Sequence, residues 1–126
     1  MSDDPADVDP LLEVAGLTKH FVQGGGFFEK PKVVRAVDGV SFKLGDGETL
    51  GLVGESGCGK STVSRTLMRL TPATAGSVRY RGQNILALDR RRLRELRRDI
   101  QIVFQDPYSS LSPKMTVREI IFEPWE

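Results

Sequence analysis

The sequence predicts an α/β fold in which antiparallel strands near the N-terminus precede a short parallel sheet with helices. Residues 33–44 alternate apolar with polar side chains, as strands with one face in water do. A glycine-rich stretch at 54–62 lies between a short apolar run at 49–53 and a pattern of helical period. A second continuous apolar run, at 100–104, is typical of a buried parallel strand.

Length and composition exclude several classes of protein. The chain has 126 residues, a net charge of +1 and a single cysteine, so it has no internal disulfide framework and is typical of a reducing compartment. The acidic first residues lack the basic and apolar regions of a signal peptide, and no run approaches the ~20 apolar residues of a spanning helix. We therefore expect a cytoplasmic chain that reaches a membrane only through a partner.

The first part of the chain predicts a lead-in followed by strands. Residues 1–10, rich in Asp and Pro, are expected to be disordered, and the ordered domain is expected to cover residues 11–126. Residues 11–14 and 17–22 predict strand pieces that are interrupted at Gly16, and a glycine loop follows at 23–26. Residues 33–44 predict an antiparallel hairpin around Asp38 and Gly39, and residues 45–47 predict a turn.

The glycine-rich stretch matches the pattern GxxxxGK(S/T) at every fixed position. Its glycines allow backbone amides to point inward at a polyphosphate, and the positive end of the following helix adds to the attraction. Lys60 is expected to reach the β and γ phosphates, and the Ser61 hydroxyl to bind a Mg²⁺ ion, with Thr62 as a second hydroxyl. The predicted nucleotide-binding residues of this loop are Gly54, Glu55, Ser56, Gly57, Cys58, Gly59, Lys60, Ser61 and Thr62.

The residues after this loop predict a helix, a strand and a second helix. Val63, Leu67 and Leu70 recur at helical spacing, and the helix is expected to end at Thr71-Pro72. Residues 77–81 predict a short strand. Asp89 is a candidate N-cap for a helix that turns Leu93 and Leu96 inward.

The second helix is rich in arginine, which is compatible with nucleic-acid binding because clustered arginines neutralise phosphates. Acidic residues are interspersed and aromatic residues are lacking, so we favour a solvated helix face and expect no nucleic-acid partner. Near the end of the chain, Thr116 and Glu119 predict a capping box that opens a helix through residues 120–122, and Pro124 is expected to end it.

Two sequence blocks resemble the ATP-binding subunits of ABC transporters. The first is LGLVGESGCGKST at 50–62 and the second is QIVFQDPYSSLSP at 101–113. The similarity extends over about residues 11–126, where AVDGVSF at 36–42 and MTV at 115–117 point to the oligopeptide and dipeptide importer branch. The resemblance implies a P-loop NTPase (ABC ATPase) core, incomplete here, with an N-terminal antiparallel β subdomain.

The resemblance also implies ligands, partners and site residues. ATP and Mg²⁺ would be the cofactors, with Gln105 as the glutamine that helps to hold Mg²⁺ and the attacking water. Phe21 resembles the aromatic residue that stacks on adenine, although Phe27 or Phe28 would be alternatives. The partners would be the transmembrane permease subunits and a second ATP-binding subunit, on the inner face of the cell membrane. Cys58 is expected to be a small loop residue, and His20 a surface residue beside the strand.

The sequence also departs from the family pattern. The signature loop LSGGQ, the acidic Walker B strand with its catalytic glutamate and the switch histidine do not occur in these 126 residues. We therefore expect residues 11–126 to be the N-terminal half of an ABC-type nucleotide-binding domain, with binding favoured over hydrolysis. The two predicted parallel strands would lack neighbours, and the chain would expose an apolar patch.

Two alternatives remain open for the function. One is a non-catalytic nucleotide-binding fragment without a transport role, which differs from the importer subunit only in what lies downstream. The other is a different P-loop enzyme, such as a small kinase or a GTPase. It is disfavoured because the chain has neither an arginine-rich lid with an acceptor site nor an Asn-Lys-x-Asp base-recognition motif.

Overall fold

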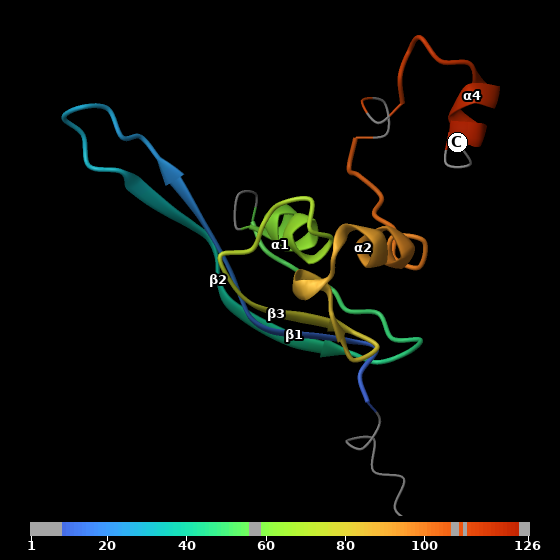
Figure 1. The fold of residues 1–126 in the computed structure, drawn as a ribbon, viewed down its shortest axis with the longest axis horizontal. Helices are drawn as coiled ribbons and strands as arrows, with labels where there is room; N and C mark the ends of the chain where they lie inside the picture. The colour runs from blue at the N-terminus through green and yellow to red at the C-terminus, as the bar shows by residue number, and fades with distance from the viewer. Residues whose placement is uncertain (1–8, 56–58, 107–108, 110, 124–126) are drawn as a thin grey trace, which may run out of the picture.

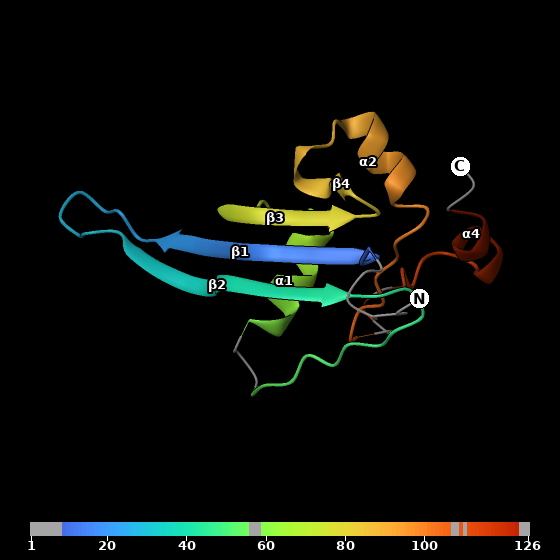
Figure 2. The same cartoon turned by 90° about the horizontal axis from the view of Figure 1, so that it is seen from below.

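The structure is a computed structural model that describes residues 9–55, 59–106, 109 and 111–123. It contains a four-stranded antiparallel sheet with helices packed on one face. The sheet order is β2-β1-β3-β4 (Figure 2). The strands are β1 (Leu12–Gln23), β2 (Lys32–Leu44), β3 (Ala75–Tyr80) and β4 (Gln83–Asn84). Most of the predicted lead-in, together with the predicted helix stop at Pro124, lies outside the described residues.

Strands β1 and β2 form one long hairpin whose far half extends beyond the rest of the sheet (Figures 1 and 2). The two predicted pieces of β1 are a single strand, with a shift of register between Val14 and Leu17. The predicted hairpin within residues 33–44 is wrong, because these residues form one strand. The chain does not turn at Asp38 and Gly39. The two residues form a local irregularity in the pairing of β2 with β1, where Gly39 has a φ of 66°.

Helix α1 (Lys60–Leu67) covers one face of the sheet (Figure 1). It ends earlier than the predicted stop at Thr71-Pro72, because Arg69 takes up a left-handed conformation at φ 53°. The N–H of Leu70 donates to the Arg65 carbonyl over 2.9 Å, and the N–H of Arg69 donates to the Thr66 carbonyl over 3.1 Å. These two bonds form a Schellman motif, which closes the helix.

The remaining helices confirm the two predicted N-caps. The Asp89 carboxylate accepts a hydrogen bond of 2.8 Å from the Arg92 N–H and opens α2 (Arg90–Leu96), which follows a 3-10 turn, η2 (Ile85–Ala87). Thr116 and Glu119 form the predicted capping box of α4 (Val117–Phe122). In α2 the leucines are buried and the arginines face solvent, which confirms the predicted solvated face.

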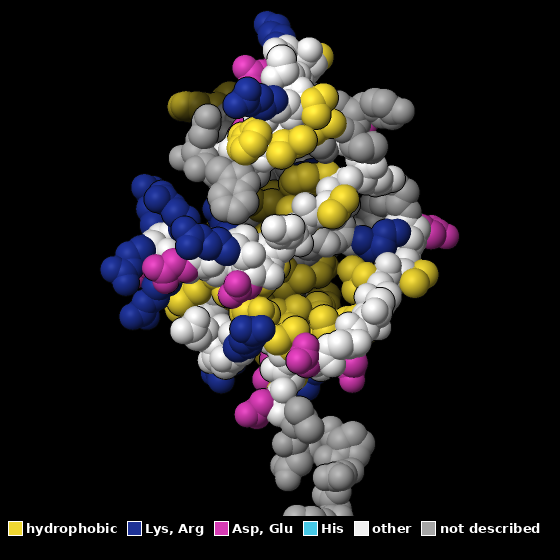
Figure 3. All heavy atoms as spheres, turned by 90° about the vertical axis from the view of Figure 1, so that its right-hand side faces the viewer, with side chains coloured by type: hydrophobic (Ala, Val, Ile, Leu, Met, Phe, Trp, Pro, Cys, Tyr) yellow, Lys and Arg dark blue, Asp and Glu magenta, His cyan; other side chains and the backbone are white. Residues whose placement is uncertain are grey.

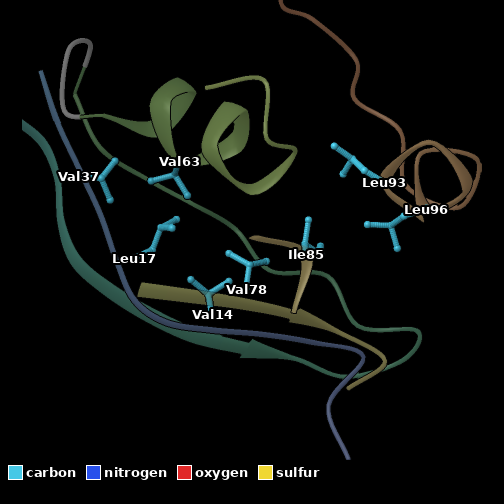
Figure 4. Close-up of a cluster of buried hydrophobic side chains, with 8 residues drawn as sticks. All are labelled: Val14, Leu17, Val37, Val63, Val78, Ile85, Leu93 and Leu96. Carbon is cyan, nitrogen blue, oxygen red and sulfur yellow. The ribbon is translucent and has the colours of Figure 1, made fainter. Parts of the chain in front are cut away.

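The core lies between the sheet and the helices (Figure 4). Leu17 and Val78, from adjacent strands, are fully buried and lie at its centre. Apolar side chains from α1, η2 and α2 pack onto the same layer. Its members are Val14, Leu17, Val37, Val63, Val78, Ile85, Leu93 and Leu96.

The two predicted parallel strands, at 49–53 and 100–104, lie in no strand. A parallel strand is stabilised by neighbours on both sides, and neither segment pairs with another strand here. Apolar side chains are therefore left open to solvent, with Val53 96% and Val103 95% exposed, which confirms the predicted apolar patch. Figure 3 shows apolar side chains gathered at the centre of one face of the molecule.

An apolar cavity of about 280 Å³ lies beside the second of these segments. Its walls come from β1, β3, α1 with its C-cap residue, η2 and residues 100–103. The lining residues are Leu12, Ser64, Leu67, Met68, Val78, Ile85, Ile100, Gln101, Ile102 and Val103. Among the described residues, no helix is long and apolar enough to span a membrane.

Candidate functional site

The glycine-rich loop leads from an extended segment into α1. Gly54 and Glu55 are exposed and without regular structure, and α1 begins at Lys60. Ser56, Gly57 and Cys58, which the sequence predicts to contact phosphate, lie outside the described residues. The described part of the loop thus consists of its two ends, with the start of a helix at one of them.

Gly59 fixes the position of the helix start against the sheet. It is the N-cap of α1 with a φ of 97°, a conformation that favours glycine. A Cβ atom at this position would lie 2.2 Å from the carbonyl oxygen of Ala36 in β2. The requirement for glycine here therefore comes from a close approach of two backbones as well as from the loop conformation.

Lys60 is held by the loop that it follows. Its Nζ donates hydrogen bonds to the carbonyl oxygens of Gly54 and, over 3.5 Å, Glu55. The ammonium group thereby links the two ends of the glycine-rich loop. A positive charge at this point is well placed to meet an anion that binds at the start of α1.

Ser61 and Gln105 share one cleft, although they are far apart in the sequence. The cleft has a volume of about 560 Å³ and lies between the first turns of α1 and the segment that follows residue 101. Its lining residues are Ser61, Ser64, Arg65, Ile102, Val103, Phe104, Gln105, Asp106 and Ser109. The structure thus brings together the two residues that the sequence predicts as Mg²⁺ ligands, whereas Thr62 is not part of the lining.

Sequence reasoning missed the other polar residues of this cleft. Ser64 and Arg65 follow Ser61 by three and four positions, which places all three on one side of α1. That spacing is the signal that identifies them. At the opposite wall, the Ser109 N–H donates to the Asp106 carboxylate over 3.3 Å, which shapes the end of the segment that carries Gln105.

Phe21 lies apart from this cleft. It is in β1, its side chain is 38% exposed, and it is not among the residues that line the cleft. The ammonium of Lys19 lies 4.9 Å from the centre of its ring. His20, expected on the surface, is partly exposed in the same strand, with Nε2 3.4 Å from a carboxylate oxygen of Asp38.

Arg69 is a structural residue that the sequence did not reveal. Its guanidinium Nη1 donates to the carbonyl oxygens of Ile85 and Leu88, over 3.2 and 2.6 Å. These bonds tie the end of α1 to the segment between β4 and α2. The sequence pattern does not reveal this role, because the left-handed conformation that turns Arg69 inward depends on tertiary contacts.

Comparison with known proteins identifies the family of this chain. The family described as ABC transporter matches residues 37–125. The oligopeptide transport ATP-binding protein OppF of Salmonella typhimurium is 51% identical over 117 residues, which are 90% of this chain and 35% of that protein. The dipeptide transport ATP-binding protein DppF of Haemophilus influenzae is 45% identical over 124 residues, which are 98% of this chain and 38% of that protein.

Solved structures show the same partial fold. A dimeric ATP-binding cassette, MJ0796 bound to ADP and Pi, superposes with a TM-score of 0.70 at 26% identity, over 90% of this chain and 46% of the cassette. This chain spans about a third of the length of the curated relatives that it matches. Its fold is the N-terminal part of an ABC ATPase, in which the antiparallel sheet takes β1 and β2 from before the helix of the glycine-rich loop and β3 and β4 from after it. The chain belongs to the ABC transporter family, within the branch whose curated relatives are oligopeptide and dipeptide transport ATP-binding proteins.

Proposed function

We propose that this chain binds ATP at the glycine-rich loop and the adjoining cleft, as part of the ATP-binding subunit of an importer for oligopeptides or dipeptides. One observation carries the proposal. Ser61, beside the loop lysine, and Gln105, from a distant part of the sequence, line the same cleft. This shared cleft supports the proposal, because the sequence pattern and the resemblance name these two side chains as ligands of one ion.

The phosphate groups would bind at the start of α1. Lys60 would exchange its bonds to the loop carbonyls for bonds to phosphate oxygens, which carry more negative charge. The free backbone N–H groups of the first helical turn and the helix dipole would add to this attraction. Gly59 keeps the helix start close to β2, which fixes where these donors would meet the phosphates.

The ion would be Mg²⁺, held between the protein and the nucleotide. Ser61 offers a hydroxyl oxygen and Gln105 an amide oxygen, and Mg²⁺ prefers such hard ligands. These side chains would supply about two of its six ligands, and phosphate oxygens and water the others. In the described part of the chain, no group of three His, Cys, Asp or Glu side chains converges on a metal site.

The adenine contact is a separate part of the proposed site. We propose Phe21, because its ring is partly exposed and a base stacks on an aromatic face. Lys19 lies near the same ring and would compete with a base for that surface. Substitution of Phe21 would then weaken binding without changing the response to Mg²⁺.

We also propose where the whole protein acts. The subunit would lie on the cytoplasmic face of the cell membrane, against permease subunits and a second ATP-binding subunit. Hydrolysis needs a general base and a signature loop, and residues 1–126 contain no LSGGQ motif and no acidic Walker B strand. These residues would therefore bind nucleotide without turning it over on their own.

A titration with a fluorescent ATP analogue tests nucleotide binding. Lys60→Ala should weaken binding by about tenfold or more, because charge-assisted hydrogen bonds are worth roughly 1.5–3 kcal/mol. Lys43→Ala is the matched control, since Lys43 is exposed and lies in β2, with a 4.0 Å ion pair to Glu13. Equal affinity of both variants would overturn the proposed site, and Mg²⁺-dependent phosphate release that Lys60→Ala abolishes would refute binding without turnover.

A further inference from the structure

The tip of the β1–β2 hairpin displays two adjacent aromatic side chains to solvent. We call residues 24–31, which join the two strands, the hairpin tip. Phe27 and Phe28 are 100% and 98% exposed, and their ring centres are 6.0 Å apart with planes tilted by 58°. The hairpin carries its tip away from the rest of the sheet and from the helices (Figures 1 and 2). These two rings therefore contribute nothing to the core.

The apolar surface continues from the tip onto the two strands. Val22 is 68% exposed and Val33 is 52% exposed, and the two residues are paired across the ladder. Large apolar side chains grouped at a protruding point are a feature of binding surfaces, because their exposure to water is unfavourable. The tip therefore has the properties of a binding surface that another molecule or assembly shields from water.

Positive charges surround this apolar point. Lys30, Lys32 and Arg35 are exposed on or beside the tip, and Glu29 is the single acidic side chain among residues 19–35. Aromatic rings flanked by basic side chains match the interface of a bilayer, where rings enter the headgroup layer and lysines meet anionic lipids. The tip backbone turns with a 3.1 Å hydrogen bond from the Glu29 N–H to the Gly26 carbonyl. Its other polar groups would stay hydrated in the headgroup layer, which contains water.

We propose that the hairpin tip inserts Phe27 and Phe28 into the headgroup layer of an anionic lipid bilayer, with Lys30 and Lys32 as its electrostatic contacts. The proposal is independent of the nucleotide site, because the cleft that Ser61 and Gln105 line contains no residue of the tip. It adds a direct lipid contact to a subunit that we otherwise place at the membrane only through partners. The contact would orient the sheet with the tip toward the bilayer.

Vesicle flotation tests this proposal with the intact chain, because aggregated protein stays at the bottom of the gradient. The chain should float with vesicles that contain phosphatidylglycerol and phosphatidylcholine, and much less with phosphatidylcholine alone. The double substitution Phe27→Ser and Phe28→Ser should lower the partition coefficient by about tenfold or more. Each of the changes Lys30→Gln and Lys32→Gln should lower it by about fivefold.

A matched control uses another exposed apolar pair. Ile121 and Phe122 in α4 are 60% and 53% exposed and lie at the other end of the molecule from the tip (Figure 1). Replacing both with serine should leave flotation unchanged. The proposal is overturned if this control lowers flotation as much as the tip variant, if the tip variant floats like the wild type, or if flotation does not depend on anionic lipid. Binding only to vesicles that carry membrane proteins would assign the tip to a protein groove and would equally overturn it.

Discussion

Replacing Gly59 with alanine is expected to displace the start of α1 and to weaken nucleotide binding. The new Cβ would lie 2.2 Å from the Ala36 carbonyl oxygen, and this neighbour is backbone, which cannot turn away as a side chain would. The left-handed conformation costs a further ~1–2 kcal/mol for a residue with a Cβ. A forced backbone shift costs typically about 1–3 kcal/mol, so the total is about 2–5 kcal/mol.

Gly47→Ala is the matched control for this prediction. Gly47 also has a positive φ, 73°, but a Cβ there would meet nothing within 4 Å. Both variants incur the cost of a left-handed conformation, and only Gly59→Ala adds the clash with backbone. The difference in free-energy cost between the two variants therefore measures the clash alone, which we expect to be about 1–3 kcal/mol. If all of that difference is expressed in binding, the affinity falls by roughly fivefold to more than a hundredfold.

Two measurements together decide the outcome. Urea unfolding gives the loss of stability, and the titration with a fluorescent ATP analogue gives the loss of affinity. The clash must show in one or both, because the helix start either moves or is held in strain. If Gly59→Ala and Gly47→Ala match in both measurements, the close approach to β2 does not set the geometry of the loop, and the reasoning fails.

Two further predictions concern the core and the C-terminal helix. Leu17→Ala should lower the free energy of unfolding by about 2–5 kcal/mol in urea, since the side chain is fully buried between the sheet and α1; a loss below about 1 kcal/mol would mean that the core is less tightly packed than described. Hydrogen bonds from the backbone N–H and then the hydroxyl of Thr116 lower the pKa of Glu119. Ionised Glu119 therefore stabilises α4 above its ordinary pKa, and this contribution should disappear as the pH falls through the lowered value. NMR chemical shifts of α4 should follow that titration in the wild type and not in Glu119→Gln, and an identical response of both proteins would contradict the assignment.

Local signals in the sequence predicted the local structure well. Asp89 and Thr116 were identified as N-caps because a cap depends on a few neighbouring residues, and both caps are present. The helix after the glycine-rich loop also begins where the pattern places it. The predicted end of this helix was wrong, because the turn at Arg69 is stabilised by hydrogen bonds from its side chain to carbonyl oxygens of a distant segment.

Strand pairing was harder to predict, since it depends on partners far away in the sequence. Residues 33–44 form one strand because β1 offers a continuous neighbour across Asp38 and Gly39. Residues 49–53 and 100–104 carry the composition of parallel strands, yet composition supplies no partner. In the candidate site, the resemblance singled out Gln105, but the approach of Gly59 to β2 was visible only in three dimensions.

The unpaired segments 49–53 and 100–104 also affect how copies of the chain behave toward one another. An extended apolar segment outside any ladder is a template onto which the same segment of another copy can add, so self-association should rise steeply with concentration. Carboxylates flank both segments, with Glu48 and Glu55 around the first and Asp99 and Asp106 around the second. In-register stacking would bring these like charges together, so the acidic flanks act as gatekeepers that oppose fibril growth.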